Sequence, residues 1–248
     1  MNLRSKVIKG LQRLNLRIIK LTKEEFGVSL EYDLEKLFTL LRKQSTRIVV
    51  FDVGANIGQS VRKFKKISPE SQIHTFEPSP TCFLELRNNT SMYTNIVYNN
   101  IGLGAEDKTI RFYENELTDI SSFLEPTNEL WGEVKSVDLM KITTLDNYCI
   151  ENYIKNINYL KIDTQGYDLE VLKGASKLLK EKSIDIVQLE ITLQKLYADI
   201  PQMDEVIKYL FDSGYRLVAF YGFHNENIQA RWTDALFISS DFGPLNDQ

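Results

Sequence analysis

The sequence predicts an α/β protein in which helices cover both faces of a mostly parallel sheet. From about residue 46 to residue 212, short apolar runs rich in β-branched residues alternate with helix-forming segments, as expected for parallel strands joined by helical crossovers. The run 48–53 is almost wholly apolar, which is typical of a strand buried on both faces. It breaks directly into a glycine-bearing turn. That turn is therefore expected at the carboxyl end of a central strand, where open α/β sheets bind ligands.

Each element of this sheet is predicted from its own pattern. Parallel strands are expected at five apolar runs: 48–53, 72–77, 95–101, 159–163 and 185–190. Helices are expected where apolar residues recur at helical spacing: 31–43, 59–66, 80–89, 169–180 and 203–212. Ser68-Pro69 stops the second of these helices, and Pro80 stands in the first turn of the third, a position that proline favours.

The remaining strands are expected to be antiparallel. Two runs alternate between apolar and polar residues, as antiparallel strands do: 108–113 and 134–142. They belong to an excursion between Gly104 and Thr143 that is too long for a plain connection, so we expect it to build part of a substrate wall. The runs 215–221 and 235–238 are expected to close a seven-stranded sheet as an antiparallel C-terminal hairpin.

We expect one α/β domain over residues 45–248, preceded by a helical extension over residues 1–44. A chain of 248 residues, 43% of them hydrophobic, can bury one substantial core. The first 23 residues contain seven basic side chains and no acidic one, and their apolar residues follow a helical stripe. This basic amphipathic helix is expected to pack on its own domain or on a second copy of the chain. The alternative is contact with an anionic membrane surface or with a partner.

Composition narrows the compartment and the partners. The two cysteines, Cys82 and Cys149, are too few to suggest a disulfide framework or a cysteine-based zinc site. No apolar run approaches the length of a membrane span, and the N-terminus lacks an uninterrupted signal-peptide core. We therefore expect a cytoplasmic protein, with peripheral membrane contact only through the N-terminal helix. Beyond residue 23 the chain holds 23 basic and 34 acidic residues, so no binding to nucleic acid is expected.

The spacing of the glycine turn narrows the choice of cofactor. Gly54 and Gly58 lack the Gly-x-Gly-x-x-Gly spacing of a dinucleotide site, and no Lys-Ser/Thr pair follows them as in a P-loop. Asp52 would place negative charge beside a pyrophosphate, whereas it could accept hydrogen bonds from an amino-bearing ligand. Glu77, at the end of the next strand, lies at about the interval where a carboxylate binds two ribose hydroxyls. Together these residues fit S-adenosylmethionine better than NAD.

Five linked motifs resemble, in order, those of FkbM-type methyltransferases: Phe51–Gly58, Phe76–Pro78, Thr144–Asp146, Leu160–Gly166 with Gly174-Ala175, and Ile186–Glu190. The resemblance spans roughly residues 47–239. It implies a Rossmann-like class I fold that depends on S-adenosylmethionine, and O-methylation of a hydroxyl on a sugar, a glycan or a related natural product. One departure is Tyr167-Asp168, where the family more often has a small residue followed by glutamate, so the local substrate wall is expected to differ.

The cofactor is expected to contact three groups of residues. The methionine portion is assigned to the glycine turn, at Asp52, Gly54, Ala55, Asn56 and Gly58. The ribose is assigned to the end of the second strand, at Glu77 and Pro78, and the adenine to the end of the third, at Asn100 and Ile101. A purely structural turn, with glycine at positive φ, is the alternative for the first group. Glu77 could instead favour the N-terminus of the following helix, and Asn100 could be a turn residue.

The candidate catalytic residues stand at the carboxyl ends of the fourth and fifth strands. Methyl transfer to an alcohol requires positioning of the reactants and removal of a proton as the oxygen attacks. Asp163 and Glu190 should both face the crevice where cofactor and acceptor meet. Asp163 is expected either to act as general base or only to orient the acceptor hydroxyl. Lys161 shares a strand face with Asp163, so an ion pair between them could adjust both groups or could simply be a buried salt bridge.

Other residues are candidates for weaker reasons. His224 follows the run 215–221 and is a further candidate proton acceptor, the alternative being a surface-loop imidazole; His74 is expected in the core. A divalent ion held by Asp163, Glu190 and His224 is not favoured, because no ligand motif specifies it. Three residues of the excursion are candidate acceptor contacts: Ser121, Ser122 and Trp131. Trp131 could stack on a sugar face or belong to the core.

Two rival functions use the same residues. One is methylation of a lipid-linked or polyketide hydroxyl at a membrane, to which the basic N-terminal helix would bind. The other is a non-catalytic binding module that retains the cofactor pocket as a scaffold, against which the pairing of Asp163 with Glu190 argues.

Overall fold

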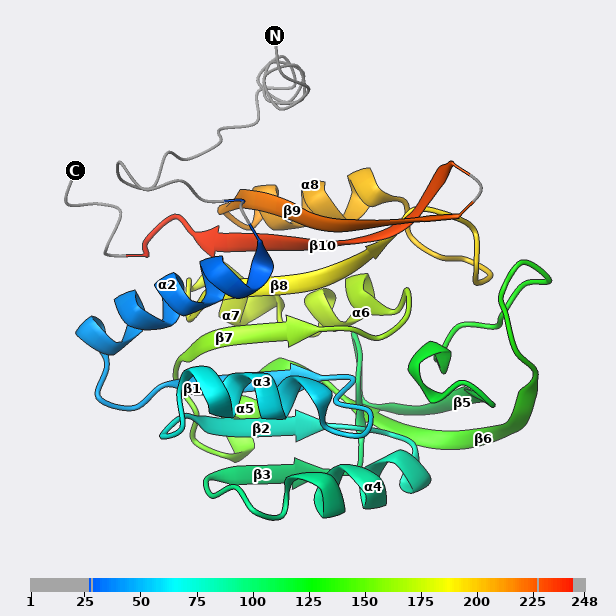
Figure 1. Cartoon of the computed structure of the whole chain (residues 1–248), viewed down its shortest axis with the longest axis horizontal. Coiled ribbons are helices and arrows are strands. Elements are labelled where there is room, and N and C mark those ends of the chain that lie inside the picture. The colour runs from blue at the N-terminus through cyan, green and yellow to red at the C-terminus, as the bar shows by residue number, and fades with distance from the viewer. Residues whose placement is uncertain (1–26, 28, 227, 243–248) are drawn as a thin grey trace, which may run out of the picture.

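A computed structural model of the chain describes residues 27, 29–226 and 228–242. Its main sheet has seven strands in the order β3-β2-β1-β7-β8-β10-β9 (Figure 1). Five of them are parallel: β1 (Val49–Val53), β2 (Gln72–Phe76), β3 (Ile96–Asn99), β7 (Ile157–Ile162) and β8 (Ile184–Thr192). The last two form an antiparallel hairpin: β9 (Tyr215–Glu226) and β10 (Gln229–Ser239). The predicted sheet is thereby confirmed.

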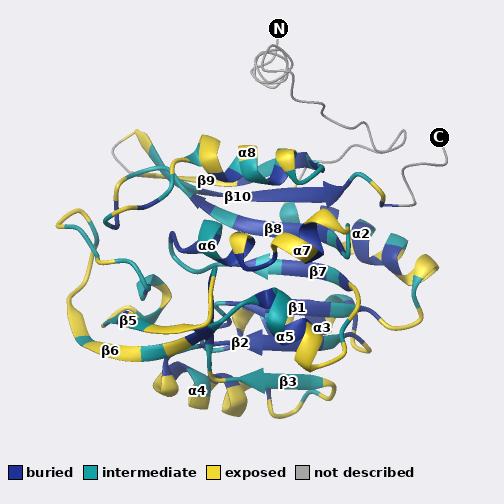
Figure 2. Ribbon diagram, turned by 180° about the vertical axis from the view of Figure 1, so that it is seen from behind, coloured by how far each residue is buried: buried dark blue, intermediate teal, exposed yellow. Residues whose placement is uncertain are grey.

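Helices cover both faces of this sheet, as predicted. One face carries α2 (Leu30–Gln44), α3 (Gln59–Ile67) and α4 (Pro80–Thr90). Figure 2 shows the opposite face, which carries α5 (Leu145–Glu151), α6 (Asp168–Lys173), α7 (Ser176–Lys180) and α8 (Met203–Asp212). The strands between the two layers supply side chains to both hydrophobic cores, which is why their sequences are apolar on consecutive residues.

Helix α2 shows how local sequence and packing agree. The Ser29 side chain accepts a hydrogen bond from the backbone amide of Tyr32 and so caps the first turn. Leu34, Phe38 and Leu41 recur on one side of the helix and are buried against the sheet. The part of the predicted extension that precedes this helix, the basic segment over residues 1–23, lies outside the described residues.

One predicted helix is interrupted in the structure. The single helix expected over 169–180 is divided into α6 and α7 at Gly174. A Cβ atom there would lie 2.0 Å from the carbonyl oxygen of Gly104, so close backbone packing fixes this point. The amides of Lys177 and Leu178 then donate to the Asp146 carboxylate, at 2.9 and 3.1 Å, which begins a new helix.

The C-terminal hairpin is longer than predicted because its backbone pairing continues beyond the apolar residues. Ala230 pairs with Asn225, and Trp232 pairs with His224. His224 therefore lies within β9 and does not follow it. The predicted third strand is shorter than expected: it ends at Asn99, and β4 (Gly102–Leu103) joins a second sheet.

That second sheet is formed by the excursion. Its strands are β4, β6 (Val134–Thr143) and β5 (Lys108–Asn115) in that order, with β5 and β6 antiparallel as predicted. A short 3-10 helix, η1 (Thr118–Ile120), lies between β5 and β6 in the chain. Figure 1 places the excursion beyond the carboxyl ends of β1 and β2. The fold thus sets a long, irregular segment against the sheet edge where ligands are expected.

Candidate active site

A cavity of about 540 Å³ includes the carboxyl edge of the sheet and extends along α3 to the first turns of α2. The glycine turn, the end of β2 and the residues that follow β7 form its walls on the sheet side. Strand β4 and residues 118–123 of the excursion form further walls. Its volume is within the range of pockets that hold small molecules.

Backbone geometry at the glycine turn explains its sequence. Gly54 has φ of +80°, and a Cβ atom there would lie 1.9 Å from the carbonyl oxygen of Asp163, so no side chain fits between β1 and β7. Gly54 and Ala55 donate their amides to the carbonyl of Phe76, at 3.0 and 3.1 Å. Gly58, at φ of +92°, packs against Thr90 and is not part of the cavity wall. Both glycines therefore have packing roles, while Gly54 and Ala55 also line the cavity.

Glu77 is fixed by backbone donors at the cavity wall. Its carboxylate accepts hydrogen bonds from the amides of Asn56, at 2.8 Å, and Ser79, at 2.9 Å. Burial raises the pKa of this carboxyl to about 7, despite these two hydrogen bonds. Pro78 also lines the cavity, whereas Asn100 and Ile101 do not.

Asn100 instead supports the loop that carries Glu77. Its side-chain amide donates to the carbonyls of Glu77 and Pro78, at 2.8 and 3.0 Å. This is the turn role that the sequence left open for Asn100.

Apolar residues line the end of the cavity beyond Glu77. Phe112 from β5 and Phe123 from the excursion pack edge to face, with ring centroids 5.0 Å apart. A Cβ atom on Gly102 would lie 2.5 Å from the Phe123 ring, so the glycine brings β4 close to this aromatic pair. We did not identify these residues from the sequence. The alternation of β5 contained a signal, because it predicts one apolar face for Phe112.

An ion pair forms part of the cavity wall. The ammonium of Lys161 lies 3.0 Å from Oδ2 of Asp163 and 3.8 Å from Oδ1 of Asp52. Asp52 is fully buried and accepts a hydrogen bond from the Ser60 hydroxyl, so it does not line the cavity. Burial raises the pKa of Asp52, although Lys161 and Ser60 oppose the shift. For Lys161, burial disfavours the charge, but Asp163 and Asp52 outweigh burial and raise its pKa.

Gln165 joins the two candidate catalytic carboxylates. Its side-chain nitrogen donates to Oδ1 of Asp163 at 3.0 Å and to Oε1 of Glu190 at 3.1 Å. The hydroxyl of Tyr197 lies 3.3 Å from the amide oxygen of Gln165, and its shorter hydrogen bond, 2.9 Å, is donated to the carbonyl of Ile120. Gln165 has φ of +54°, an uncommon conformation for a side chain of this size. The motif Leu160–Gly166 contains this residue, but nothing in the sequence pointed to its bridging role.

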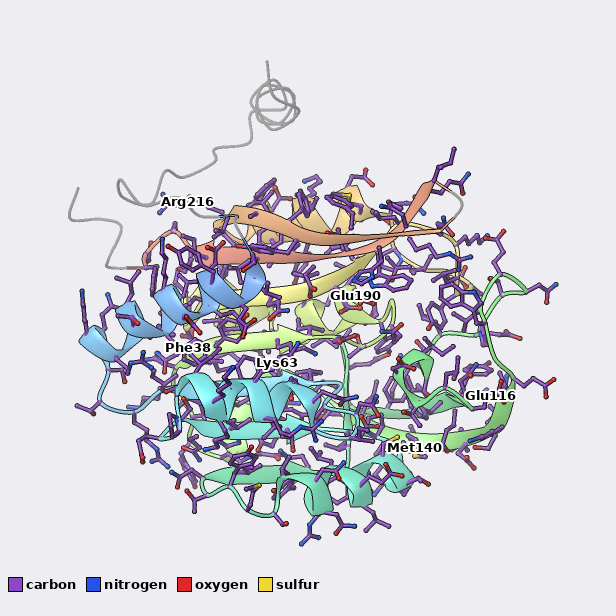
Figure 3. All side chains as sticks on the ribbon, viewed as in Figure 1. Phe38, Lys63, Glu116, Met140, Glu190 and Arg216 are labelled. Carbon is purple, nitrogen blue, oxygen red and sulfur yellow. The ribbon has the colours of Figure 1, made fainter. Side chains whose placement is uncertain are left out.

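Glu190 lies at the carboxyl end of β8, on the side of the molecule that carries the excursion (Figure 3). Burial raises its pKa well above the usual range for glutamate, and the carboxylates of Asp163, Asp168 and Asp234 raise it further. Asp234 stands directly opposite Glu190 in the β8–β10 register. Asp163 lines the cavity, and Glu190 is linked to that wall through Gln165.

The structure separates the predicted acceptor contacts into two groups. Ser121 and Ser122 line the cavity, and the Ser122 hydroxyl donates to the carbonyl of Gln165 at 2.9 Å. Trp131 and His224 are not part of the cavity wall. The His224 ring stacks on Trp232, so the structure does not show it joining the carboxylates at the cavity.

Two further observations concern residues outside the catalytic group. His74 is buried and shares a 2.8 Å hydrogen bond with the Tyr148 hydroxyl, in agreement with a core role. Within the described ranges, no three His, Cys, Asp or Glu side chains are grouped so that they could hold a metal ion. In the same part of the chain, no helix is both long and apolar enough to cross a bilayer.

Comparison with known proteins places residues 52–217 in a single family. This segment matches the model of the methyltransferase FkbM domain. The 2-O-methyltransferase NoeI of Sinorhizobium fredii is 24% identical over 173 residues, which cover 65% of this chain and 70% of that protein. The hexuronic acid methyltransferase AglP of Haloferax volcanii is 26% identical over 153 residues, 60% of this chain and 59% of that protein.

Among solved structures, an rRNA methylase from Streptococcus thermophilus is similar to this chain with a TM-score of 0.48 and 10% sequence identity. The similarity covers 87% of this chain and 99% of that one.

Proposed function

The chain belongs to the FkbM methyltransferase family, and on this premise we propose that it methylates a hydroxyl of a sugar, a glycan or a related natural product. Bound S-adenosylmethionine supplies a methyl group on a positively charged sulfur. The printed activities of NoeI, a 2-O-methyltransferase, and AglP, a hexuronic acid methyltransferase, support a sugar hydroxyl as the acceptor.

The residues at the cavity fit this cofactor. Glu77 presents a carboxylate held by two backbone amides, the arrangement needed for ribose hydroxyls. Phe112 and Phe123 offer an apolar wall for a purine ring. The side-chain oxygen of Asn56 is buried and has no hydrogen-bond partner among the described residues, so it can accept from the amino group of the methionine portion.

The observation that carries the catalytic proposal is the bridge from Asp163 through Gln165 to Glu190. Asp163 is held by Lys161 and Gln165, which suits it to orient the acceptor hydroxyl. Burial and neighbouring carboxylates raise the pKa of Glu190, which makes its ionised form a stronger base toward an alcohol than an ordinary glutamate. We therefore assign orientation to Asp163 and proton removal to Glu190.

Turnover is tested by incubating the purified chain with S-adenosylmethionine and a panel of saccharides. Formation of S-adenosylhomocysteine together with the mass gain of one methyl group on a saccharide would support the proposal. The absence of transfer to any saccharide, by protein that binds S-adenosylhomocysteine, would contradict it.

The Glu77→Gln variant is expected to bind S-adenosylhomocysteine about 5- to 150-fold more weakly than the wild type. The cause is the loss of charged hydrogen bonds to the ribose, worth about 1–3 kcal/mol. Calorimetric titration measures the affinity, and Glu85→Gln on the exposed side of α4 is the matched control. Unchanged affinity in Glu77→Gln would contradict the ribose contact and leave Glu77 with only its backbone hydrogen bonds. If the folded wild-type protein does not bind S-adenosylhomocysteine, the assignment of the cofactor to this cavity is wrong.

We further propose a cytoplasmic location with peripheral membrane contact through residues 1–23, or alternatively contact with a second copy of the chain. Two buried cysteines that form no disulfide agree with a reducing compartment. Seven basic residues in this segment could contribute about 1 kcal/mol each at an anionic surface.

Deleting residues 1–23 is expected to abolish co-sedimentation with vesicles that contain phosphatidylserine and to leave the affinity for S-adenosylhomocysteine within about twofold. The reason is that the basic residues act through charge, so added salt should release the full-length chain from the vesicles as well. Equal sedimentation of both chains would exclude the membrane contact. A change of mass in analytical ultracentrifugation on deletion would instead support contact between copies.

A further inference from the structure

Both tryptophans of the chain lie together outside the cavity. The rings of Trp131, from the excursion, and Trp232, in β10, meet at nearly a right angle, with centroids 5.9 Å apart and planes at 84°. The imidazole of His224, in β9, stacks on Trp232 at 4.8 Å with an interplanar angle of 16°. Trp131 is 36% exposed, and His224 is also exposed. We name these three residues the tryptophan surface.

The register of the sheet aligns this surface with the candidate catalytic residues. Trp232 pairs with Thr192 of β8, and Asp234 pairs with Glu190. Residues two apart on a strand share a face, so Trp232 and Asp234 lie on the same face of the sheet. Glu190, directly opposite Asp234, belongs to that face as well. Gln188, two residues before Glu190, lines the cavity. The cavity, the carboxylates and the tryptophan surface therefore succeed one another along one face of β8 and β10.

The spacing along these strands exceeds the reach of one sugar. At about 3.4 Å per residue, Trp232 lies about 7 Å beyond Asp234 along β10. The His224 ring covers one face of Trp232, so a pyranose ring would pack against the exposed parts of the tryptophan surface. Such a ring is displaced along β10 from a ring whose hydroxyl meets Glu190. Two linked sugars could occupy both positions.

Other contacts hold the tryptophan surface in place. The guanidinium of Arg231 lies 3.9 Å from the Trp131 ring centroid and covers one face of that ring. The excursion is also tied to the segment after β8, because the Thr127 hydroxyl donates to the carbonyl of Lys195 at 2.8 Å and Pro126 forms a bridge with Tyr197. A surface fixed in this way loses little conformational entropy on binding.

We propose that the tryptophan surface binds a second sugar of an oligosaccharide acceptor, next to the sugar that is methylated. This inference rests on the proposed function. The polarised C–H groups of a pyranose face pack against the negative face of an aromatic ring, while the carboxylates of Asp234 and Glu190 can accept hydrogen bonds from the hydroxyls of the adjoining sugar that is methylated. An anionic membrane surface fits less well, because those carboxylates would repel it.

Tryptophan emission reports directly on this surface, because the chain has no other tryptophan. Protein saturated with S-adenosylhomocysteine is titrated with glucose, N-acetylglucosamine and glucuronic acid, and with tetrasaccharides built from each. A saturable change of emission is expected with at least one tetrasaccharide and not with its monosaccharide. Emission that responds to no saccharide, or that responds only to phosphatidylcholine–phosphatidylglycerol vesicles, would overturn the proposal.

The Trp232→Ala and Trp131→Ala variants test whether this binding serves the reaction. Each is expected to raise KM for the responding tetrasaccharide about 5- to 10-fold, and to leave turnover of the matched monosaccharide within about twofold. Tyr153→Ala, which removes an exposed aromatic ring elsewhere, is the matched control. Unchanged KM in both tryptophan variants would overturn the proposal. Equal losses on tetrasaccharide and monosaccharide would also overturn it, because they indicate general damage.

The two proposals fail in different ways. If no saccharide is methylated while tetrasaccharides still change the emission, the proposed reaction fails and the binding surface stands. If a monosaccharide is methylated as well as its tetrasaccharide and the emission stays constant, the reaction stands and the tryptophan surface is not an acceptor site.

Discussion

Replacing Glu190 by glutamine is expected to lower kcat for methyl transfer about 10²- to 10⁴-fold, the usual contribution of a positioned general base. Glutamine keeps the shape of the side chain and can still contact Gln165, but it cannot accept the proton of the acceptor hydroxyl. Affinity for S-adenosylhomocysteine should stay unchanged, because Glu190 does not line the cavity. Single-turnover rates with an accepted saccharide, together with calorimetric titration of S-adenosylhomocysteine, measure the two quantities.

The pH dependence gives a sharper test of the same assignment. Burial and three neighbouring carboxylates raise the pKa of Glu190, so at low pH the group is protonated and cannot act as a base. The rate should therefore rise with pH through the pKa of Glu190 and then level off. In Asp234→Asn one of the like charges is removed, so the pKa of Glu190 falls and the rising limb moves to lower pH.

Asp163→Asn separates the two carboxylates. If Glu190 is the base, Asp163→Asn loses acceptor orientation but retains the pH-dependent limb, whereas Glu190→Gln loses that limb. The reverse result would assign proton removal to Asp163 and orientation to Glu190.

The parts of the site that the sequence predicted are those that follow from one strand and its turn. A buried strand ending in Gly54 and a second strand ending in Glu77 are local patterns, and parallel strands bring their carboxyl ends together by topology alone. The structure accordingly places Gly54, Asn56 and Glu77 along one cavity wall. Asp163 joins them because β7 pairs directly with β1.

The parts that could not be predicted depend on contacts across the fold. The bridge of Gln165 to Glu190 joins residues 25 positions apart and needs the positive φ of Gln165, which side-chain identity does not indicate. The sequence suggests His224 as a proton acceptor because an imidazole can take up a proton near neutral pH, and it predicts that the preceding strand ends at residue 221. Backbone pairing with β10, at residues without an apolar alternation, extends β9 to Glu226 and places His224 against Trp232 instead. Strand residues held by backbone pairing alone show no alternation of apolar and polar side chains, so the sequence does not predict them as a strand.

Removing the ammonium of Lys161 is expected to destabilise the protein by about 3–5 kcal/mol at neutral pH, as found when a buried charge loses its partner. Lys161→Met keeps the length and the apolar stem of the side chain, so the loss reports mainly on charge. In this variant the fully buried Asp52 keeps its hydrogen bond from the Ser60 hydroxyl but loses the neighbouring cation. The negative charge of Asp163, which also loses its partner, then repels the charge of Asp52. Urea denaturation measures the change, with Lys155→Met on the surface as the matched control.

The sign of the pH dependence follows from Asp52. Its folded-state pKa is already raised above the unfolded value, and loss of Lys161 raises it further. A carboxyl with a raised folded-state pKa contributes stability that is fully present below the unfolded pKa of about 4 and is lost as pH rises through the folded-state pKa. The deficit of Lys161→Met should therefore grow as pH rises above the unfolded pKa of about 4.

The same argument predicts compensation in Lys161→Met combined with Asp52→Asn. With Lys161 and Asp52 both uncharged, the remaining unpaired carboxylate is that of Asp163, whose side chain is 33% exposed and reaches solvent. The double variant should therefore recover much of the loss and lose the added pH dependence. A stability of Lys161→Met equal to that of the wild type across this pH range would mean that the charge of Asp52 needs no cation. The charges of Asp52, Lys161 and Asp163 would then serve the acceptor reaction and would not stabilise the fold.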